Sequence, residues 1–158
     1  MTREKLNRHL DTFTLTDGFV ETVEYCRANG IPLTILSDGF DYYIEYLLAR
    51  HGITGVEYRA NHLIFANGSL AVEFPFEAMG CGRCGNCKRW HMETGAVDGE
   101  TIVYVGDGYS DRYAVRKAHV VFARGDLIDY CNKHGIAFTS FSDFFDILKY
   151  LENGSRNV

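Results

Sequence analysis

The sequence has no long apolar segment, no basic block and no apolar stretch near its first residue. The longest apolar runs, Ile31–Leu36 and Thr101–Val105, are too short to span a bilayer, so we expect no membrane partner. A formal net charge of −5 without a basic cluster argues against nucleic acid as a partner. The beginning, MTREKLNRHL, is charged and has no secretory h-region, which predicts a cytoplasmic protein.

The chain also lacks an even number of cysteines, since it has five. An odd number without a secretory signal argues against a disulfide framework. Three of them form C-x2-C-x2-C at Cys81, Cys84 and Cys87, and His91 follows. Three thiolates and an imidazole would complete a tetrahedral Zn²⁺ site, with His62 as an alternative fourth ligand. The spacing also resembles part of an iron–sulfur run, and a reduced, metal-free cysteine turn is the remaining interpretation.

The chain is long enough for one domain with a real core. Hydrophobic residues make up 46% and aromatic residues 14% of 158 residues, which is typical of a globular protein. Residues 1–50 follow a pattern of two helices, a buried strand, a turn and a helix, which predicts half of a parallel α/β sheet. The ranges are Thr2–Phe13, Gly18–Ala28 with Asp17 as N-cap, Pro32–Leu36, Ser37–Gly39 and Phe40–Arg50.

The second part of the chain begins with a different pattern. Two β-rich segments joined by Asn67-Gly68 predict a hairpin, and a loop rich in cysteine and glycine follows it. We interpret residues 56–88 as an insertion in a single domain, 1–158. Alternating strands and helices then complete the α/β pattern, ending in a helix with Ser142 as N-cap. Their ranges are Thr101–Val105, Asp111–Lys117, His119–Ala123, Leu127–Lys133, Ile136–Thr139 and Phe141–Leu151.

Two carboxylates follow the apolar strand Thr101–Val105 in the segment VGDGYSD. Ligands bind open α/β sheets at the carboxyl ends of the strands, and paired carboxylates there suit Mg²⁺. Asp107 and Asp111 are therefore candidate metal ligands. A capping role at the start of a helix also explains Asp111, but it explains Asp107 less well.

Two polar segments are candidate phosphate-binding groups. Ser37, Asp38 and Gly39 lie between a strand and a helix, where backbone N–H groups favour anions. Lys88 follows the cysteine loop and carries a compact positive charge suited to a phosphate. Taken alone, Ser37 also fits an ordinary turn serine, and Lys88 an ordinary surface lysine.

Taken together and in order, these segments resemble the motifs of the haloacid dehalogenase (HAD) superfamily. PLTILSDGFDYYIEYLL resembles the second motif with Ser37, GNCKRWHM the third with Lys88, and VGDGYSD the fourth with Asp107 and Asp111. The resemblance is to the phosphoserine-phosphatase-like branch, in particular its 2-hydroxy-3-keto-5-methylthiopentenyl-1-phosphate phosphatases, and it extends from Asp17 to Leu151. It implies a Rossmann-type three-layer fold around a parallel sheet.

The first motif of that superfamily, a strand ending in DxDx(T/V), is missing from the sequence. In that fold this strand is central, between the strands that end at Ser37 and Asp107, and it supplies the nucleophilic aspartate. A buried sheet does not leave unpaired N–H and C=O groups at its centre. Either the two flanking strands pair directly, or another polypeptide supplies the strand, or the chain is part of a longer protein.

The resemblance implies a Mg²⁺-dependent phosphoric monoester hydrolase, or the C-terminal portion of one, acting on a phosphorylated small molecule. Ser37 and Lys88 would hold the phosphoryl group, Asp107 the metal, and Asp111 the metal's water shell or Lys88. Without the nucleophile we expect little or no turnover. The alternative is a non-catalytic phosphate- or zinc-binding subunit. An unfilled sheet position makes strand pairing with a second chain or a second copy a further expectation.

Overall fold

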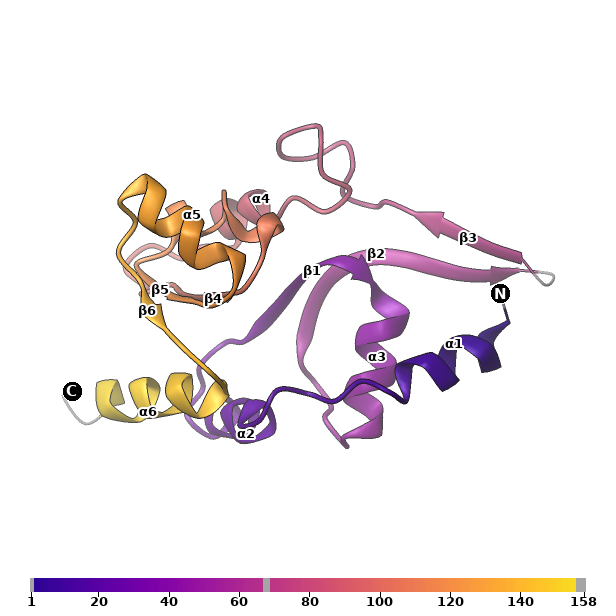
Figure 1. Ribbon diagram of the computed structural model, residues 1–158, viewed down its shortest axis with the longest axis horizontal. Helices are drawn as coiled ribbons and strands as arrows, with labels where there is room; N and C mark the ends of the chain where they lie inside the picture. The colour runs from indigo at the N-terminus through magenta and orange to yellow at the C-terminus, as the bar shows by residue number, and fades with distance from the viewer. Residues whose placement is uncertain (1, 67–68, 156–158) are drawn as a thin grey trace.

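The computed structural model describes residues 2–66 and 69–155, and Figure 1 shows the arrangement of the elements. The predicted Asn67-Gly68 turn lies outside these residues. The first half contains α1 (Arg3–Leu10), α2 (Phe19–Ala28), β1 (Thr34–Phe40), α3 (Asp41–Arg50), β2 (Glu57–Ala66) and β3 (Ser69–Glu73). The second half contains α4 (Lys88–Gly95), β4 (Val103–Gly106), η1 (Tyr109–Asp111), η2 (Val115–Lys117), β5 (Val120–Ala123), α5 (Asp126–His134), β6 (Thr139–Ser140) and α6 (Phe144–Ser155). Within the described ranges, no helix combines the length and the apolar character needed to cross a membrane.

The strands form two separate sheets of three strands each (Figure 1). In the first, β1 pairs with β2 in parallel and β2 pairs with β3 as an antiparallel hairpin. In the second, β4, β5 and β6 are all parallel. No ladder joins β1 to β4 within the described residues, so the expectation that the two strands flanking the missing one pair directly is wrong. In the part of the chain that the structure describes, β1 and β4 each keep one edge without a strand partner.

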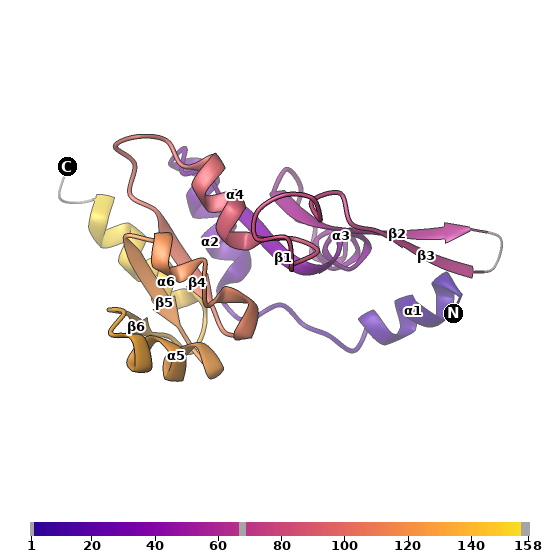
Figure 2. The same ribbon diagram turned by 90° about the horizontal axis from the view of Figure 1, so that it is seen from above.

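Strands β1 and β4 are covered by helices on two faces, which gives three layers (Figure 1). Figure 2 shows the two sheets side by side. In β1, Ile35 packs with α2 and α3, whereas Leu36 packs with the cluster around α4 and α5. In β4, Tyr104 belongs to that same cluster, whereas Val103 and Val105 pack against α6. This alternation follows from the two-residue period of a strand. The cluster shared by Leu36 and Tyr104 connects the two sheets through side chains.

Strand β1 begins later than predicted and runs through the predicted Ser37–Gly39 turn. Its pairing with β2 shifts between the pairs Leu36–Arg59 and Phe40–Asn61, so three residues of β1 lie opposite one of β2. Side-chain amides replace ladder bonds here, because Asn86 Nδ2 donates to the Ser37 carbonyl at 2.7 Å and Asn61 Nδ2 to the Asp38 carbonyl at 2.8 Å. The predicted turn is therefore a bulged end of a strand.

The helices differ from the prediction at three places, which are the N-cap of α2, the segment 111–117 and the start of α6. Gly18, not Asp17, is the N-cap of α2, with φ 79°, and a Cβ there would lie 2.5 Å from the backbone nitrogen of Phe145. Only glycine fits this left-handed conformation and this close approach to α6. The predicted helix 111–117 is instead the pair of 3₁₀ turns η1 and η2. Ser142 lies before α6, and Asp143 Oδ1 accepts from the Phe145 N–H at 2.9 Å.

Candidate functional site

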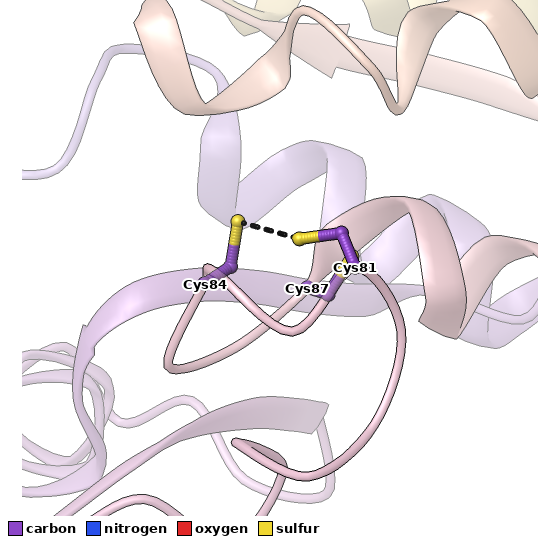
Figure 3. Close-up of side chains that lie close together, drawn as sticks. All are labelled: Cys81, Cys84 and Cys87. Atoms are coloured by element: carbon purple, nitrogen blue, oxygen red, sulfur yellow. Dashed lines mark hydrogen bonds between the residues drawn. The ribbon is translucent and has the colours of Figure 1, made fainter.

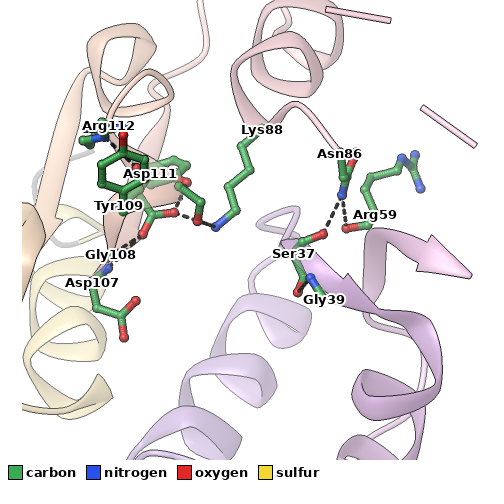
Figure 4. A network of polar contacts seen from close by, with 12 residues as sticks. Ser37, Gly39, Arg59, Asn86, Lys88, Asp107, Gly108, Tyr109, Asp111 and Arg112 are labelled. Atoms are coloured by element: carbon green, nitrogen blue, oxygen red, sulfur yellow. Dashed lines mark hydrogen bonds and ion pairs between the residues drawn. The ribbon is translucent and has the colours of Figure 1, made fainter. Parts of the chain in front are cut away.

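An ion pair between Lys88 and Asp111 lies at the carboxyl end of β4 (Figure 4). Lys88 is the first residue of α4, and its Nζ donates to Asp111 Oδ1 at 2.7 Å and to Ser110 Oγ at 2.9 Å. The two side chains are only 12% and 5% exposed, respectively. A buried pair of this kind keeps a positive charge at a defined position, which is what an anion site requires.

Both oxygens of the Asp111 carboxylate accept hydrogen bonds from groups of the protein itself. Oδ1 also accepts from the Tyr104 hydroxyl at 2.8 Å, and Oδ2 accepts from the N–H groups of Asp107 and Gly108, both at 3.0 Å. Burial favours the neutral acid, but the charge of Lys88 and these hydrogen bonds outweigh it and hold the pKa of Asp111 below its usual value. Asp111 is therefore placed to orient Lys88 and the turn, and it has no open oxygen for direct metal ligation.

The glycine in the VGD segment makes room for this carboxylate. A Cβ on Gly106 would lie 2.7 Å from Asp111 Oδ2 and 3.0 Å from the ring of Tyr104. Real Cβ atoms do not approach other atoms this closely, so a larger residue would displace Asp111 from its donors.

Asp107 differs from Asp111 because its side chain is 64% exposed. Its nearest charged partner is Arg124, whose Nη2 lies 3.7 Å from Oδ2. Mg²⁺ in proteins is held by one or two carboxylates together with waters and substrate oxygens. The open carboxylate of Asp107 fits that donor set, whereas Asp111 fits an outer position.

The predicted phosphate segment lies on the other side of Lys88 (Figure 4). Ser37 Oγ accepts from the Gly39 N–H at 3.0 Å within the bulged end of β1. Partial burial raises the pKa of Asp38, and the nearby charge of Lys88 opposes that shift. The structure therefore brings Ser37, Asp38 and Gly39 to the same end of the molecule as Lys88 and Asp111.

Two buried asparagines hold this region together, and the sequence analysis missed both. Asn86 is 1% exposed, and its Nδ2 bridges the carbonyls of Ser37 at 2.7 Å and Arg59 at 2.8 Å. Asn61 is 3% exposed and binds the Asp38 carbonyl, while its Oδ1 has no hydrogen-bond partner among the described residues. The position of Asn86 between Cys84 and Lys88 was the only available signal, and an asparagine in a glycine-rich loop resembles an ordinary turn residue.

A cavity of about 1270 Å³ separates β1 from β4. Consecutive residues of both strands line it, including 33–36 and 102–107, and Lys88 and Asp111 lie at its lining as well. Side chains alternate between faces, so a lining made of consecutive residues means that the edge of β4 and the edge of the first half of β1 face the cavity. The unpaired edges of β1 and β4 thus border one space, whose walls include the ion pair.

The three thiols of the C-x2-C-x2-C segment converge, whereas both predicted histidine ligands lie elsewhere. The Sγ atoms of Cys81, Cys84 and Cys87 all lie within 4.8 Å of one another (Figure 3). His91 Nε2 contacts Asn86 Oδ1, and His62 Nδ1 lies 2.6 Å from Asp41 Oδ2. Neither histidine belongs to the cysteine group, so the predicted four-residue zinc set is not assembled; the side-chain hydrogen bonds of the two imidazoles explain why.

The fold and the site define an α/β protein with a buried lysine and two aspartates at the carboxyl edge of a parallel sheet. Comparison with known families agrees with this class. The sequence model of the haloacid dehalogenase-like hydrolase family matches residues 1–116 of this chain. The chain therefore belongs to that family.

Curated relatives make the relationship more specific. The 2-hydroxy-3-keto-5-methylthiopentenyl-1-phosphate phosphatase of Exiguobacterium sibiricum is 32% identical over 137 residues, which are 85% of this chain and 62% of the relative. The phosphatase of the same name from a second Exiguobacterium strain is 30% identical over 143 residues, or 89% of this chain and 66% of the relative. The chain thus spans less than two thirds of the length of either relative.

Solved structures show the same fold. Phosphoserine phosphatase in its apo form superimposes with a TM-score of 0.65 at 25% identity, covering 93% of this chain and 72% of that one. A phosphoserine phosphatase from T. onnurineus gives a TM-score of 0.63 at 19% identity, covering 95% of this chain and 65% of that one. The chain therefore shares its α/β fold with these phosphatases.

Proposed function

We propose that this chain is the phosphate- and metal-binding portion of a Mg²⁺-dependent phosphoric monoester hydrolase. The observation that carries the proposal is the buried Lys88–Asp111 pair beside the open carboxylate of Asp107, at the lining of the cavity. Phosphoryl transfer depends mainly on positioning and on neutralising charge. This arrangement supplies a fixed cation for a phosphoryl oxygen and an open carboxylate beside it.

Each residue has a distinct role in this proposal. Lys88 neutralises charge on the phosphoryl oxygens, and Asp111 keeps its ammonium group in place. The hydroxyl of Ser37 donates to a phosphoryl oxygen, with the backbone of Asp38 and Gly39 shaping the turn. Asp107 holds Mg²⁺, which when bound polarises the phosphoryl group. The substrate class is a phosphorylated small molecule, as the names of the curated relatives suggest.

We further propose that an extended segment from outside the described residues fills the cavity between β1 and β4. The two unpaired strand edges that border the cavity favour a β-strand, and its apolar lining residues, such as Leu36 and Val105, favour apolar side chains. In the family motif that strand ends in the nucleophilic aspartate. The ammonium group of Lys88 lies at the lining of the same cavity and would face the aspartate at the end of that strand. We therefore expect the 158-residue chain alone to have little or no turnover.

The test is hydrolysis of p-nitrophenyl phosphate with Mg²⁺, by the chain alone and with an apolar strand ending in DxDGT fused before Met1. We expect turnover only with the added strand, and we expect Asp107→Asn to abolish it. A matched fusion with asparagine in place of the first aspartate is the control. If the unmodified chain showed turnover that disappears in Asp107→Asn, the proposal that a further strand is needed would be wrong. If no fusion showed turnover, the proposed hydrolase function would be wrong.

A non-catalytic phosphate-binding subunit is the alternative, and Asp38 favours it over the hydrolase because its carboxylate disfavours the phosphoryl position that turnover needs. This carboxylate lies near Lys88 and would repel a phosphate unless it is protonated. The alternative predicts saturable binding of inorganic phosphate by the chain, detected by calorimetry, with no turnover in any fusion. Asp38→Gly would then strengthen binding without creating activity.

A further inference from the structure

Three cysteine side chains of the loop between β3 and α4 face a common point (Figure 3). The Sγ atoms of Cys81 and Cys84 lie 3.4 Å apart, and those of all three cysteines lie within 4.8 Å of one another. With Zn–S bonds of about 2.3 Å, two sulfurs of a tetrahedral zinc site are about 3.8 Å apart. The Cys81–Cys84 separation is slightly shorter than that value, and the 4.8 Å limit leaves the other two pairs compatible with it. Among the described residues, no other group of three metal-ligating side chains meets in this way.

The backbone of the loop is shaped to bring the thiols together. Gly80 has φ 73°, and a Cβ there would lie 2.7 Å from Cys87 Cβ and 2.8 Å from Cys87 Sγ. Gly82 also has a left-handed conformation, with φ 67°. Glycine tolerates both the positive φ and the close approach. The turn that leads from Cys81 to Cys84 is therefore folded back onto Cys87, which is 4% exposed at the N-cap of α4.

We propose that Cys81, Cys84 and Cys87 bind one Zn²⁺ ion as thiolates, with the three thiol protons released to solvent. Soft thiolate ligands select zinc over Mg²⁺, so this site is chemically distinct from the carboxylate of Asp107. Four-cysteine ligation is usual for iron–sulfur clusters, and three cysteines converge here. The fourth zinc position is taken by water or by an external ligand, because His91 and His62 are engaged with other side chains.

The position of this site connects it with the rest of the molecule. Asn86, which holds the ends of β1 and β2, lies between Cys84 and Cys87, and Lys88 follows Cys87 directly. A zinc ion that fixes Cys84 and Cys87 would therefore fix both residues as well. Zinc would order the loop that carries the phosphate-binding lysine, without contacting the substrate.

The test is an anaerobic titration of the reduced 158-residue chain with Co²⁺, followed by Zn²⁺. We expect the thiolate-to-cobalt charge-transfer band and tetrahedral d–d bands at one Co²⁺ per chain, and Zn²⁺ should remove both. Cys84→Ser should weaken binding by more than the roughly 10–100-fold that loss of an outer-sphere partner costs. Arg83→Ala, an exposed position in the same loop, is the matched control and should bind normally.

A second variant separates loss of the site from loss of the fold. Cys81 is exposed, so Cys81→Ser should keep the far-ultraviolet circular dichroism spectrum and still lose the cobalt bands. His91→Gln should retain them, because His91 is not a ligand. Cobalt bands that persist in folded Cys81→Ser would overturn the proposal. So would a reduced wild-type chain without these bands, or a Cys81–Cys84 disulfide found by mass spectrometry in place of metal.

Discussion

The carboxyl ends of β1 and β4 are fixed in different ways. At the end of β4, the Asp111 carboxylate accepts four hydrogen bonds from within its own half of the molecule, including one from Lys88. At the end of β1, the ladder is interrupted and the chain is held by amides from Asn86 and Asn61. The β4 end is thus organised around one buried charge, and the β1 end around neutral donors brought by other elements.

Because of this difference, the two strand ends should respond differently to destabilising substitutions. Removing a partner from a buried ion pair leaves an uncompensated charge, which costs more than removing a neutral hydrogen bond. The β4 end should therefore be the more sensitive of the two to a single substitution. The β1 end should be the more sensitive to changes in the cysteine loop, because Asn86 belongs to that loop.

The largest effect is expected for Asp111→Ala. It leaves the ammonium group of Lys88 buried without a counter-charge, and we expect a loss of about 3–5 kcal/mol in the free energy of unfolding. Urea denaturation measures the loss. Asp107→Ala, in the same turn but with an exposed side chain, is the control and should change stability by no more than about 0.5 kcal/mol. Equal losses in both variants would contradict the assignment of Asp111 as the organising residue.

A smaller loss is expected for Asn86→Ala at the β1 end. The carbonyls of Ser37 and Arg59 lose a buried donor, which should cost about 2–3 kcal/mol in the same measurement. Asn132→Ala, at an exposed position on α5, provides the comparison and should be nearly neutral. If Asn86→Ala exceeded Asp111→Ala, the ranking of the two strand ends would be reversed.

Gly106→Ala tests the close packing around the Asp111 carboxylate. The added Cβ would meet Asp111 Oδ2 at 2.7 Å, so we expect about 1–3 kcal/mol of destabilisation from overpacking. Gly95, at the end of α4, has no atom within 4 Å of such a Cβ. Gly95→Ala should therefore be neutral or slightly stabilising, and similar thermal unfolding midpoints for the two variants would argue against the steric explanation.

The smallest effect concerns acid stability. The folded-state pKa of Asp111 is lowered, so its contribution is complete above the unfolded-state pKa, near 3.9 for aspartate. That contribution decreases as the pH falls below this value and through the lower folded-state pKa. Asp111→Asn should flatten the decline of unfolding free energy in this range. A decline as steep as that of the wild type would assign the acid sensitivity to other carboxylates.

Much of the architecture was predictable because it follows from hydrophobic periodicity. The helices α1, α2, α3 and α5 occupy the predicted segments within a few residues, and each strand except the short β6 overlaps its predicted segment by several residues. The errors lie where tertiary contacts outweigh local preference. Gly18 caps α2 because α6 passes too close for a Cβ, and β1 extends past Ser37 because distant amides bind its carbonyls.

The site was predictable only in part. The order of the motifs predicted that Ser37, Lys88, Asp107 and Asp111 belong to one site, but sequence spacing could not distinguish the buried carboxylate from the exposed one. That distinction depends on the donors that surround Asp111, among them the Tyr104 hydroxyl on a different element. His91 lies near the cysteines in sequence, yet a buried contact with Asn86 holds its ring away from them. Such side-chain partners arise only when the loop is folded.

The cavity between β1 and β4 also reverses the usual order of backbone protection. In most sheets the middle strands exchange their amide hydrogens most slowly, because both of their edges are paired. Within the described residues, β1 and β4 lie in the middle of the molecule and each keeps an unpaired edge, whereas β2 and β5 are paired on both sides. Hydrogen exchange should therefore be slowest in β2 and β5, while alternate amides of β1 and β4 exchange quickly. A strand that enters the cavity would be recognised by the slowing of those amides alone.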